Sequence, residues 1–280
     1  MYYYILDPQN IGEKAFEERQ IALQGYLAEF KINGEMGRVT PLRSIQSLVE
    51  TASERGVKTL VACGTDETFN LMLSYLQGRD FTIGFIPLND SSYLAKIFGL
   101  KNLYNSVKTL AARRVVKIDL ATVAKSYFVS YLEFGIASSK IKDLSWWSSI
   151  KTLSAPSQQL SVRIDNSYVM NLNCLGGIVA NTRSTSSESE TIANPTDGFL
   201  DLLVIEKLNK YQVIKYKEAI LQGQLEKIPG TSVIKCRKLE FLEPEGFPLT
   251  ISGRVITKLP ATVEVIQKRL RVIVGKDRTF

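Results

Sequence analysis

The chain has 280 residues, of which 45% are hydrophobic and 22% charged, so it can form one large domain or two ordinary ones, each with its own core. It contains no histidine, which excludes Ser-His-Asp and Cys-His nucleophiles and any zinc site that needs imidazole. A formal net charge of +7 favours anionic partners such as nucleotide phosphates, an acidic lipid surface or nucleic acid.

The first part of the chain alternates strands with helices. Apolar runs predict strands at 2–6, 36–40, 58–62 and 81–87, and helical spacing of apolar residues predicts helices at 13–30, 40–56, 66–78 and 91–100. In the second helix we expect Pro41 just inside the start and Leu42 on the apolar face. Such alternation predicts right-handed βαβ units and a parallel sheet with helices on both faces.

After residue 118 the pattern changes to short alternating strands separated by turn residues. We expect strands at 127–136, 159–165, 168–177, 198–206, 235–243, 247–253 and 261–274, with one helix at 209–224. The predicted fold is therefore an α/β domain over 1–118 followed by an antiparallel β-sandwich over 119–280. The C-terminal segment could return to the first domain and pack against it.

The stretch 61–76, VACGTDETFNLMLSYL, has the pattern of a strand, a polar turn and a helix. Ligands of parallel sheets lie at the carboxyl ends of strands, where helix N-termini present N–H groups and partial positive charge. Gly64 would let a phosphate approach the backbone, and Thr65 and Thr68 could donate hydroxyl hydrogen bonds. The alternative is an ordinary strand-to-helix loop with a helix cap and no ligand.

Several segments, in order along nearly the whole chain, resemble the diacylglycerol kinase catalytic domain family, which includes bacterial lipid kinases and sphingosine kinases. The stretch GTDETFN at 64–70 is similar to the family's GGDGTxN nucleotide loop. The first strand and its turn at 2–12, the segment GFIPLNDSSYLAKIFGL, the segment NPTDGFLDLLVIE and the closing TISGRVITKLP also resemble family motifs. The resemblance implies a three-layer α/β domain of the NAD kinase and diacylglycerol kinase type, followed by a β-sandwich.

The resemblance also implies an ATP-dependent kinase that uses Mg²⁺ and phosphorylates a diacylglycerol-like lipid at a membrane surface. It makes Asp66 the candidate catalytic residue, organising metal or phosphate. The implied nucleotide-binding residues are Thr40, Gly64, Thr65, Asp66, Glu67, Thr68, Phe69, Asn70 and Asp90. The implied metal ligands are Asn194, Asp197 and Phe199, the first and last through their carbonyls. An ordinary β-turn explains the Thr-Asp-Gly sequence there equally well.

The sequence departs from the family pattern at positions that bind the nucleotide or take part in catalysis. Thr65 and Glu67 replace glycines, and Asp90 stands where a threonine is expected. Arg254 occupies the position of the carboxylate base, and arginine stays protonated. We expect the foreign charges of Glu67 and Arg254 to be linked. A catalytically impaired nucleotide- or lipid-binding regulatory protein of the same fold is therefore the main alternative, and an NAD kinase-like enzyme is a lesser one.

Localisation and partners follow from the remaining features. No apolar stretch reaches the roughly 18 residues of a membrane span, and the N-terminus lacks the pattern of a signal peptide, so we expect a cytoplasmic protein, peripheral at most to a membrane. Paired tryptophans among lysines at 140–151 are a candidate membrane contact, or else an edge of the sandwich. No aromatic-basic motif favours nucleic acid. A homodimer is left open, and three dispersed cysteines suggest neither a disulfide framework nor a metal site.

Overall fold

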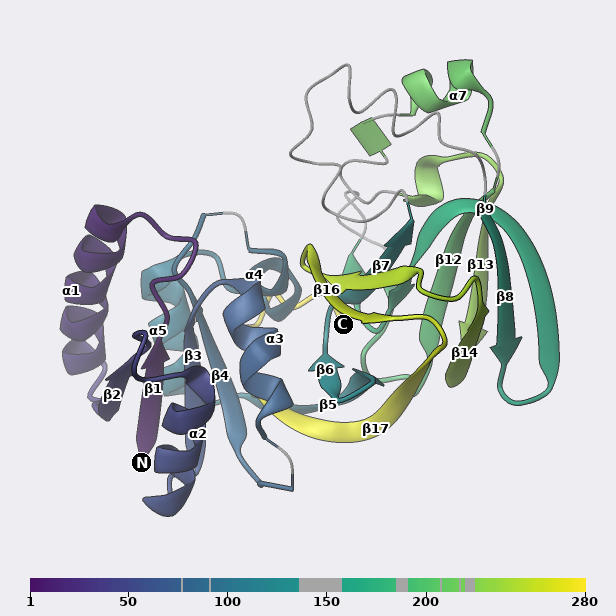
Figure 1. Cartoon of the computed structure of the whole chain (residues 1–280). Helices are drawn as coiled ribbons and strands as arrows, with labels where there is room; N and C mark the ends of the chain where they lie inside the picture. Colours follow the sequence, from purple (N-terminus) through teal and green to yellow (C-terminus); the bar gives the residue numbers. More distant parts are fainter. Residues whose placement is uncertain are drawn as a thin grey trace. The chain divides into compact units, whose positions relative to one another are not determined.

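The computed structural model describes residues 1–76, 78–90, 92–135, 158–184, 191–206, 208–216, 218–219 and 225–280. These residues form two compact units (Figure 1). Unit 1 comprises Met1–Ile118 and Gln267–Phe280, and unit 2 comprises Asp119–Ile266. The chain passes from one unit to the other within two strands, β5 (Val115–Val123) and β17 (Ala261–Ile273).

Unit 1 contains a parallel sheet in the order β17-β4-β3-β1-β2. Its strands are β1 (Tyr2–Leu6), β2 (Glu35–Arg38), β3 (Thr59–Gly64), β4 (Thr82–Pro87) and the last part of β17. Arg271 and Val272 of β17 pair with Thr82 and Ile83 of β4. The C-terminal segment thus adds a strand to the N-terminal sheet.

Helices cover both faces of this sheet, as a parallel sheet requires. They are α1 (Glu13–Glu29), α2 (Ile45–Glu54), α3 (Asp66–Ser74), α4 (Tyr93–Phe98) and α5 (Leu103–Ala112). Helices α1 and α5 share a core with one set of strand side chains, which includes Tyr4 and Ile86. On the opposite face, Phe69 of α3 packs on Phe85 of β4 and Phe98 of α4, with ring centroids 5.2 and 5.5 Å apart.

Two sequence expectations for unit 1 were wrong. Helix α2 begins at Ile45 after Ser44, whose hydroxyl accepts a hydrogen bond from the Ser47 N–H at 3.2 Å. Pro41 therefore lies before the helix, and the Leu42 side chain is exposed because it belongs to the preceding turn. Helix α5 was not expected as a separate element, although it begins at a capping asparagine.

Unit 2 is a β-sandwich in which every strand pair with a defined register is antiparallel. Apart from β5 and β17, its larger strands are β7 (Tyr131–Gly135), β8 (Gln158–Ile164), β9 (Tyr168–Ala180), β12 (Leu200–Glu206), β13 (Thr231–Cys236), β14 (Lys238–Glu243), β15 (Pro248–Ile251) and β16 (Arg254–Lys258). The shorter ones are β6 (Ser126–Phe128), β10 (Arg183–Ser184) and β11 (Thr191–Ala193).

The long strand β9 connects the layers of the sandwich. Its first half pairs with β8, and its second half lies between β7 and β12. Gly177 lies in the second half, where a Cβ atom would collide with the Leu203 carbonyl of β12, so only glycine fits. The core between the layers includes Phe134 and Phe241, whose ring centroids are 5.4 Å apart.

The expected sandwich is confirmed, with differences in the boundaries of its strands. No helix occurs within the described residues 158–184 and 191–206. The single strand expected at 127–136 is two strands, β6 and β7, and the expected helix at 209–224 is described as α7 (Lys210–Lys215) with a 3-10 turn at Leu225–Lys227. The candidate membrane contact at 140–151 lies outside the described residues. Among the described helices, none is both long and apolar enough to span a membrane.

Candidate functional site

The predicted nucleotide residues of unit 1 follow the carboxyl ends of three parallel strands, and an aspartate that was not predicted follows a fourth. Asp7 follows β1, Thr40 follows β2, the turn Gly64–Asp66 joins β3 to α3, and Asp90 follows β4. In the order of the strands, β1 lies between β2 and β3, and β4 lies beside β3. One edge of the sheet therefore carries all of these residues, as expected for a ligand site in an open α/β fold.

The turn before α3 is held by a reciprocal cap. The Thr65 hydroxyl accepts a hydrogen bond from the Thr68 N–H at 3.4 Å, and the Thr68 hydroxyl oxygen accepts one from the Thr65 N–H at 3.0 Å. The buried Thr68 hydroxyl in turn donates to the Asp7 carboxylate at 2.8 Å. Both hydroxyls are thus engaged within the protein, and Asp7 fixes the start of α3 to the end of β1.

Gly64 is required by this cap. A Cβ atom at this position would lie 3.0 Å from both Cβ and Cγ2 of Thr68 and still closer to its hydroxyl oxygen. The missing side chain therefore makes room for Thr68, which adds a second reason for glycine to the close approach of a phosphate expected from the sequence.

Asp66 connects the N-termini of two helices. One carboxylate oxygen accepts hydrogen bonds from the N–H groups of Tyr93 at 2.7 Å and Leu94 at 3.2 Å, in the first turn of α4. The other oxygen accepts a short hydrogen bond from the Ser92 hydroxyl. Burial raises the pKa of this carboxyl, while the three hydrogen bonds oppose that shift. These contacts make Asp66 a positioning residue, and its catalytic role stays a prediction.

The two foreign carboxylates of the site have partners within unit 1. Arg19 of α1 forms an ion pair with Asp90, with nitrogen-oxygen distances of 2.8 and 3.0 Å, and also donates to the Leu88 carbonyl. The Asn10 amide donates to the Glu67 carboxylate at 3.2 Å. Arg19 thus offsets the charge of Asp90, and Asn10 orients the Glu67 carboxylate. Arg254 belongs to unit 2, so its expected link to Glu67 stays a prediction.

The remaining nucleotide candidates differ in exposure. Thr40 is exposed and pairs its backbone with Arg43 in a tight turn. The Phe69 side chain is fully buried in the core, so only its backbone could meet a ligand. Asn70 is also buried, and its carbonyl accepts a hydrogen bond from Ser74. The turn, which is half-buried at residues 65–67, therefore shares this edge with Thr40 and Asp90, whereas the Phe69 ring lies in the core.

The predicted metal ligands lie in a turn of unit 2 between β11 and β12. The Asp197 carboxylate accepts one hydrogen bond from the Phe199 N–H at 2.9 Å and another from the Lys235 ammonium at 2.8 Å. The Asn194 carbonyl accepts a hydrogen bond from the Asp197 N–H at 3.3 Å. These residues do come together, but Lys235 already supplies a cation to Asp197. The set therefore fits a divalent metal poorly.

This turn is attached to β5 through Asp119, which is completely buried. The Asp119 N–H donates to the Pro195 carbonyl at 2.6 Å, and its carboxylate accepts from the Gly198 N–H at 2.7 Å. The segment that resembles the family's base motif forms a separate hairpin between β15 and β16. Ser252 and Gly253, both with positive φ, make its two-residue turn, and exposed Arg254 begins β16.

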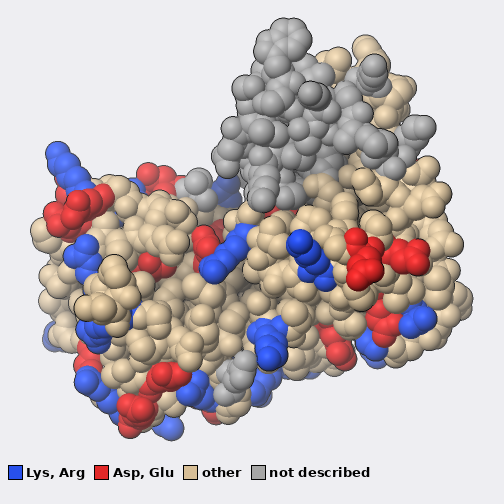
Figure 2. Space-filling model, in the orientation of Figure 1, with Lys and Arg blue, Asp and Glu red and all other residues tan. Residues whose placement is uncertain are grey.

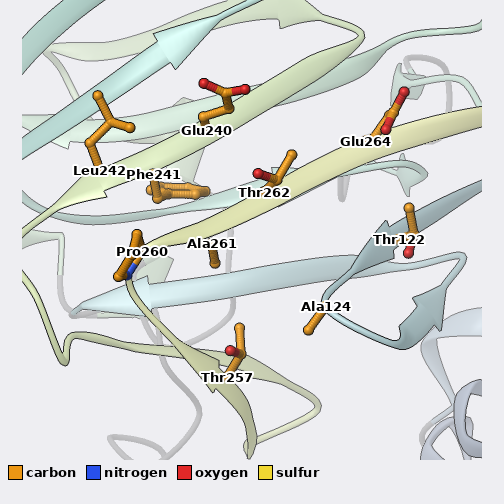
Figure 3. Close-up of a pocket in the computed structure, with 10 residues that line it drawn as sticks. All are labelled: Thr122, Ala124, Glu240, Phe241, Leu242, Thr257, Pro260, Ala261, Thr262 and Glu264. Carbon is orange, nitrogen blue, oxygen red and sulfur yellow. The ribbon is translucent and has the colours of Figure 1, made fainter.

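Unit 2 also contains an open pocket of about 550 Å³ between β14, β16 and β17 (Figure 3). Its lining residues are Thr122, Ala124, Glu240, Phe241, Leu242, Thr257, Pro260, Ala261, Thr262 and Glu264. Arg163 and Lys238 each lie 2.7 Å from the Glu240 carboxylate, and they lower its pKa. The Glu240 carboxylate in the pocket wall is thus engaged by two cationic side chains.

Charged residues are dispersed over the visible face of each unit. In Figure 2, lysines and arginines are interspersed with acidic side chains among the described residues of this face. The three cysteines are buried and free. In the part of the chain that the structure describes, no group of three acidic or cysteine side chains could hold a metal ion.

Sequence reasoning missed five residues that organise these sites: Asp7, Arg19, Ser92, Asp119 and Lys235. Asp7 carried a usable signal, because it directly follows a buried strand at the expected ligand edge. Ser92 carried another, since a serine before an apolar helical run is a common N-cap. Arg19 and Lys235 carried none, because their partners are distant in sequence.

Comparison with known proteins agrees with this architecture. Residues 3–123 match the diacylglycerol kinase catalytic domain, and residues 148–274 match the YegS C-terminal NAD kinase beta sandwich-like domain. A search of curated proteins found no match.

Solved structures with a similar fold include three from Bacillus anthracis str. Sterne that are described as diacylglycerol kinases, two of them by provisional assignment. They share 15, 16 and 14% identity with this chain, with TM-scores of 0.79, 0.78 and 0.76. The alignments cover 99, 98 and 99% of this chain and 96, 97 and 97% of the others. These structures support the fold, and the two domain matches, which follow one another along the chain, show that this chain belongs to the diacylglycerol kinase and YegS-like lipid kinase family.

Proposed function

We propose that this protein is an ATP-dependent lipid kinase that phosphorylates the hydroxyl group of a diacylglycerol-like lipid at a membrane surface. The observation that carries this proposal is the turn from Gly64 to Thr68, capped at the ligand edge of a parallel sheet in a chain of this family. The turn is fixed on two sides, to β1 through Asp7 and to α4 through Asp66.

We assign nucleotide binding to the backbone of this turn. The first N–H groups of a helix have no partner within the helix, and the helix dipole favours negative charge beside them. Because the Thr65 and Thr68 hydroxyls are engaged in the cap, they shape the turn and do not need to contact the phosphates. Thr40 and the ion pair of Arg19 with Asp90 would border the same edge.

In the proposed reaction the lipid hydroxyl oxygen forms a bond to the γ-phosphorus, and the bond from that phosphorus to the ADP oxygen breaks. Magnesium bound with ATP would supply charge neutralisation, and the Glu67 carboxylate, which accepts a hydrogen bond from Asn10, would be its candidate ligand at the start of α3. The hydroxyl proton must leave, and Arg254 cannot accept it. A missing base is tolerable, because such transfer depends mainly on positioning, and a general base contributes about 10² to 10⁴-fold.

The second candidate is a catalytically impaired protein that binds nucleotide or lipid without phosphoryl transfer. Arg254 at the position of the base favours it, and so does the Asp66 carboxylate, whose oxygens already accept three hydrogen bonds. An NAD kinase-like activity is a lesser candidate, since the sandwich model that matches unit 2 is itself described as NAD kinase-like.

One assay separates these candidates. Purified protein is incubated with γ-labelled ATP, Mg²⁺ and vesicles with or without diacylglycerol, with free NAD as a third acceptor, while ATP binding is measured by calorimetry. We expect a labelled phospholipid only in the vesicles that contain diacylglycerol. Binding of ATP with no labelled product would support the impaired protein, and label on NAD would support the lesser candidate. Absence of ATP binding would contradict both kinase activities and would leave only a protein that binds lipid.

A further inference from the structure

We propose that Lys235 is a built-in cation for the Asn194–Phe199 turn, so that this turn holds its shape without a divalent metal. The resemblance to lipid kinases places metal ligands at Asn194, Asp197 and Phe199. In the structure the ammonium of Lys235 contacts the Asp197 carboxylate at 2.8 Å, where a metal ion would bind it.

The position of Lys235 follows from the register of the sheet. Lys235 on β13 is the direct partner of Asp201 on β12, and Asp201 lies four residues after Asp197. Directly opposed residues of antiparallel strands project to the same face, with Cβ atoms about 4.5–5.5 Å apart. The ammonium lies 3.8 Å from the buried Asp201 carboxylate, so it serves both aspartates. The strand pairing itself therefore delivers a positive charge to the turn.

A second positive charge lies beside the same turn. The guanidinium carbon of Arg237 lies 4.9 Å from the centre of the Phe199 ring, a cation-π contact. A divalent ion bound by Asp197 and Phe199 would therefore meet two cationic side chains at short range. Ca²⁺ takes six to eight oxygen ligands and Mg²⁺ takes six, with waters among them and carboxylates supplying negative charge. At Asp197 the Lys235 ammonium already supplies a cation to the carboxylate.

The turn has a structural task that explains why it needs a fixed shape. Its Pro195 carbonyl accepts a hydrogen bond from the Asp119 N–H, and its Gly198 N–H donates one to the Asp119 carboxylate. Asp119 is a buried residue of β5 and the first residue of unit 2. The ion pair of Lys235 with Asp197 thus holds a turn that anchors β5 within unit 2.

The test measures the melting temperature in the presence of EDTA, Mg²⁺ or Ca²⁺, without nucleotide or lipid, so its outcome is independent of kinase activity. We expect the wild-type Tm to be the same in all three conditions. Lys235→Met should lower Tm by about 2–4 °C, as loss of roughly 1 kcal/mol does in a chain of this size, and Ca²⁺ or Mg²⁺ should restore part of the loss. Lys235→Arg should keep most of the wild-type Tm in EDTA.

Lys258→Met is the matched control, because it removes an exposed lysine on β16, and it should leave Tm and its metal response unchanged. The proposal is overturned if wild-type Tm rises with Mg²⁺ or Ca²⁺ and Asp197→Asn abolishes that rise. It is also overturned if Lys235→Met leaves Tm unchanged. If Lys235→Met does not fold, the melting temperature of Lys235→Arg tests the proposal instead. A Lys235→Arg protein that folds only with Mg²⁺ or Ca²⁺ would contradict the proposal. An equal metal response in wild type and Asp197→Asn supports it, since the metal then binds elsewhere.

Discussion

Replacing Gly64 with alanine tests whether the turn before α3 is shaped by its contact with Thr68. The added Cβ would lie 3.0 Å from Cβ and Cγ2 of Thr68, and closer to its hydroxyl oxygen. Thr68 can move only by leaving its present rotamer, which would break its bonds to Thr65 and Asp7. Overpacking costs about 1–3 kcal/mol and loss of a cap about 1 kcal/mol, so we expect Gly64→Ala to destabilise by about 2–4 kcal/mol.

A double-mutant cycle isolates this contact. Thr68→Ala removes the hydroxyl and Cγ2, and should itself cost about 1–2 kcal/mol through the lost cap and the lost bond to Asp7. In that background only the contact between the two Cβ atoms remains. Gly64→Ala should then cost about 1–2 kcal/mol less than in the wild type, a coupling of the size seen between residues in contact.

Denaturant unfolding followed by circular dichroism measures these differences, with equal m-values as a check that the transitions are comparable. Gly25→Ala is the matched control, because Gly25 lies in the exposed face of α1 with no atom within 4 Å of an added Cβ. It should stabilise the protein by up to about 1 kcal/mol. An equal cost of Gly64→Ala in the wild-type and Thr68→Ala backgrounds would refute the proposed contact.

Other substitutions test the electrostatics of the same edge. Because the pKa of Asp66 is raised in the folded protein, its contribution to stability is full below the unfolded pKa of about 3.8 and is lost as pH rises through the folded value. In thermal scans, the Tm of the wild type minus the Tm of Asp66→Asn should therefore fall as pH is raised from 4 to 7. An increase of this difference would contradict the prediction. Arg19→Gln should weaken ATP binding by leaving Asp90 unpaired, and Asp90→Asn in that background should restore the Kd measured by calorimetry. Glu67→Gln should strengthen ATP binding about fivefold in EDTA, as expected for about 1 kcal/mol of charge repulsion, and less with Mg²⁺ present. An unchanged Kd in EDTA would exclude a position of Glu67 near the phosphates, and equal strengthening in both conditions would exclude its contact with the metal.

The local patterns of the sequence were sufficient for most of the fold. The apolar run at β1 and the turn residues around β4 identified these strands within one or two residues, because buried strands of parallel sheets have few alternative readings. The start of α2 was wrong because Pro41 and Ser44 both mark helix starts, and only tertiary packing decides between them. Helix α5 was missed although Asn102 caps it, because ten residues give only a short helical pattern directly before a strand.

The sequence was sufficient to locate the candidate site but not to predict the contacts within it. The pattern of strand, Gly64 and helix identified the edge, because the topology of α/β sheets fixes where such turns lie. The contacts that define the chemistry join residues far apart in the chain, such as Thr68 with Asp7 and Arg19 with Asp90. No local periodicity specifies such partners, and therefore neither the engagement of the two threonines nor the pairing of Asp90 could be predicted.

The central claim is that ATP binds to the turn from Gly64 to Asn70, and amide hydrogen exchange of that segment tests it most directly. Exchange is measured with and without ATP and Mg²⁺, at concentrations where calorimetry shows binding. We predict slower exchange of residues 64–70, with little change in the β8–β9 hairpin of unit 2, which serves as an internal reference. Saturating ATP that leaves the exchange of residues 64–70 unchanged while protecting another segment would contradict the account.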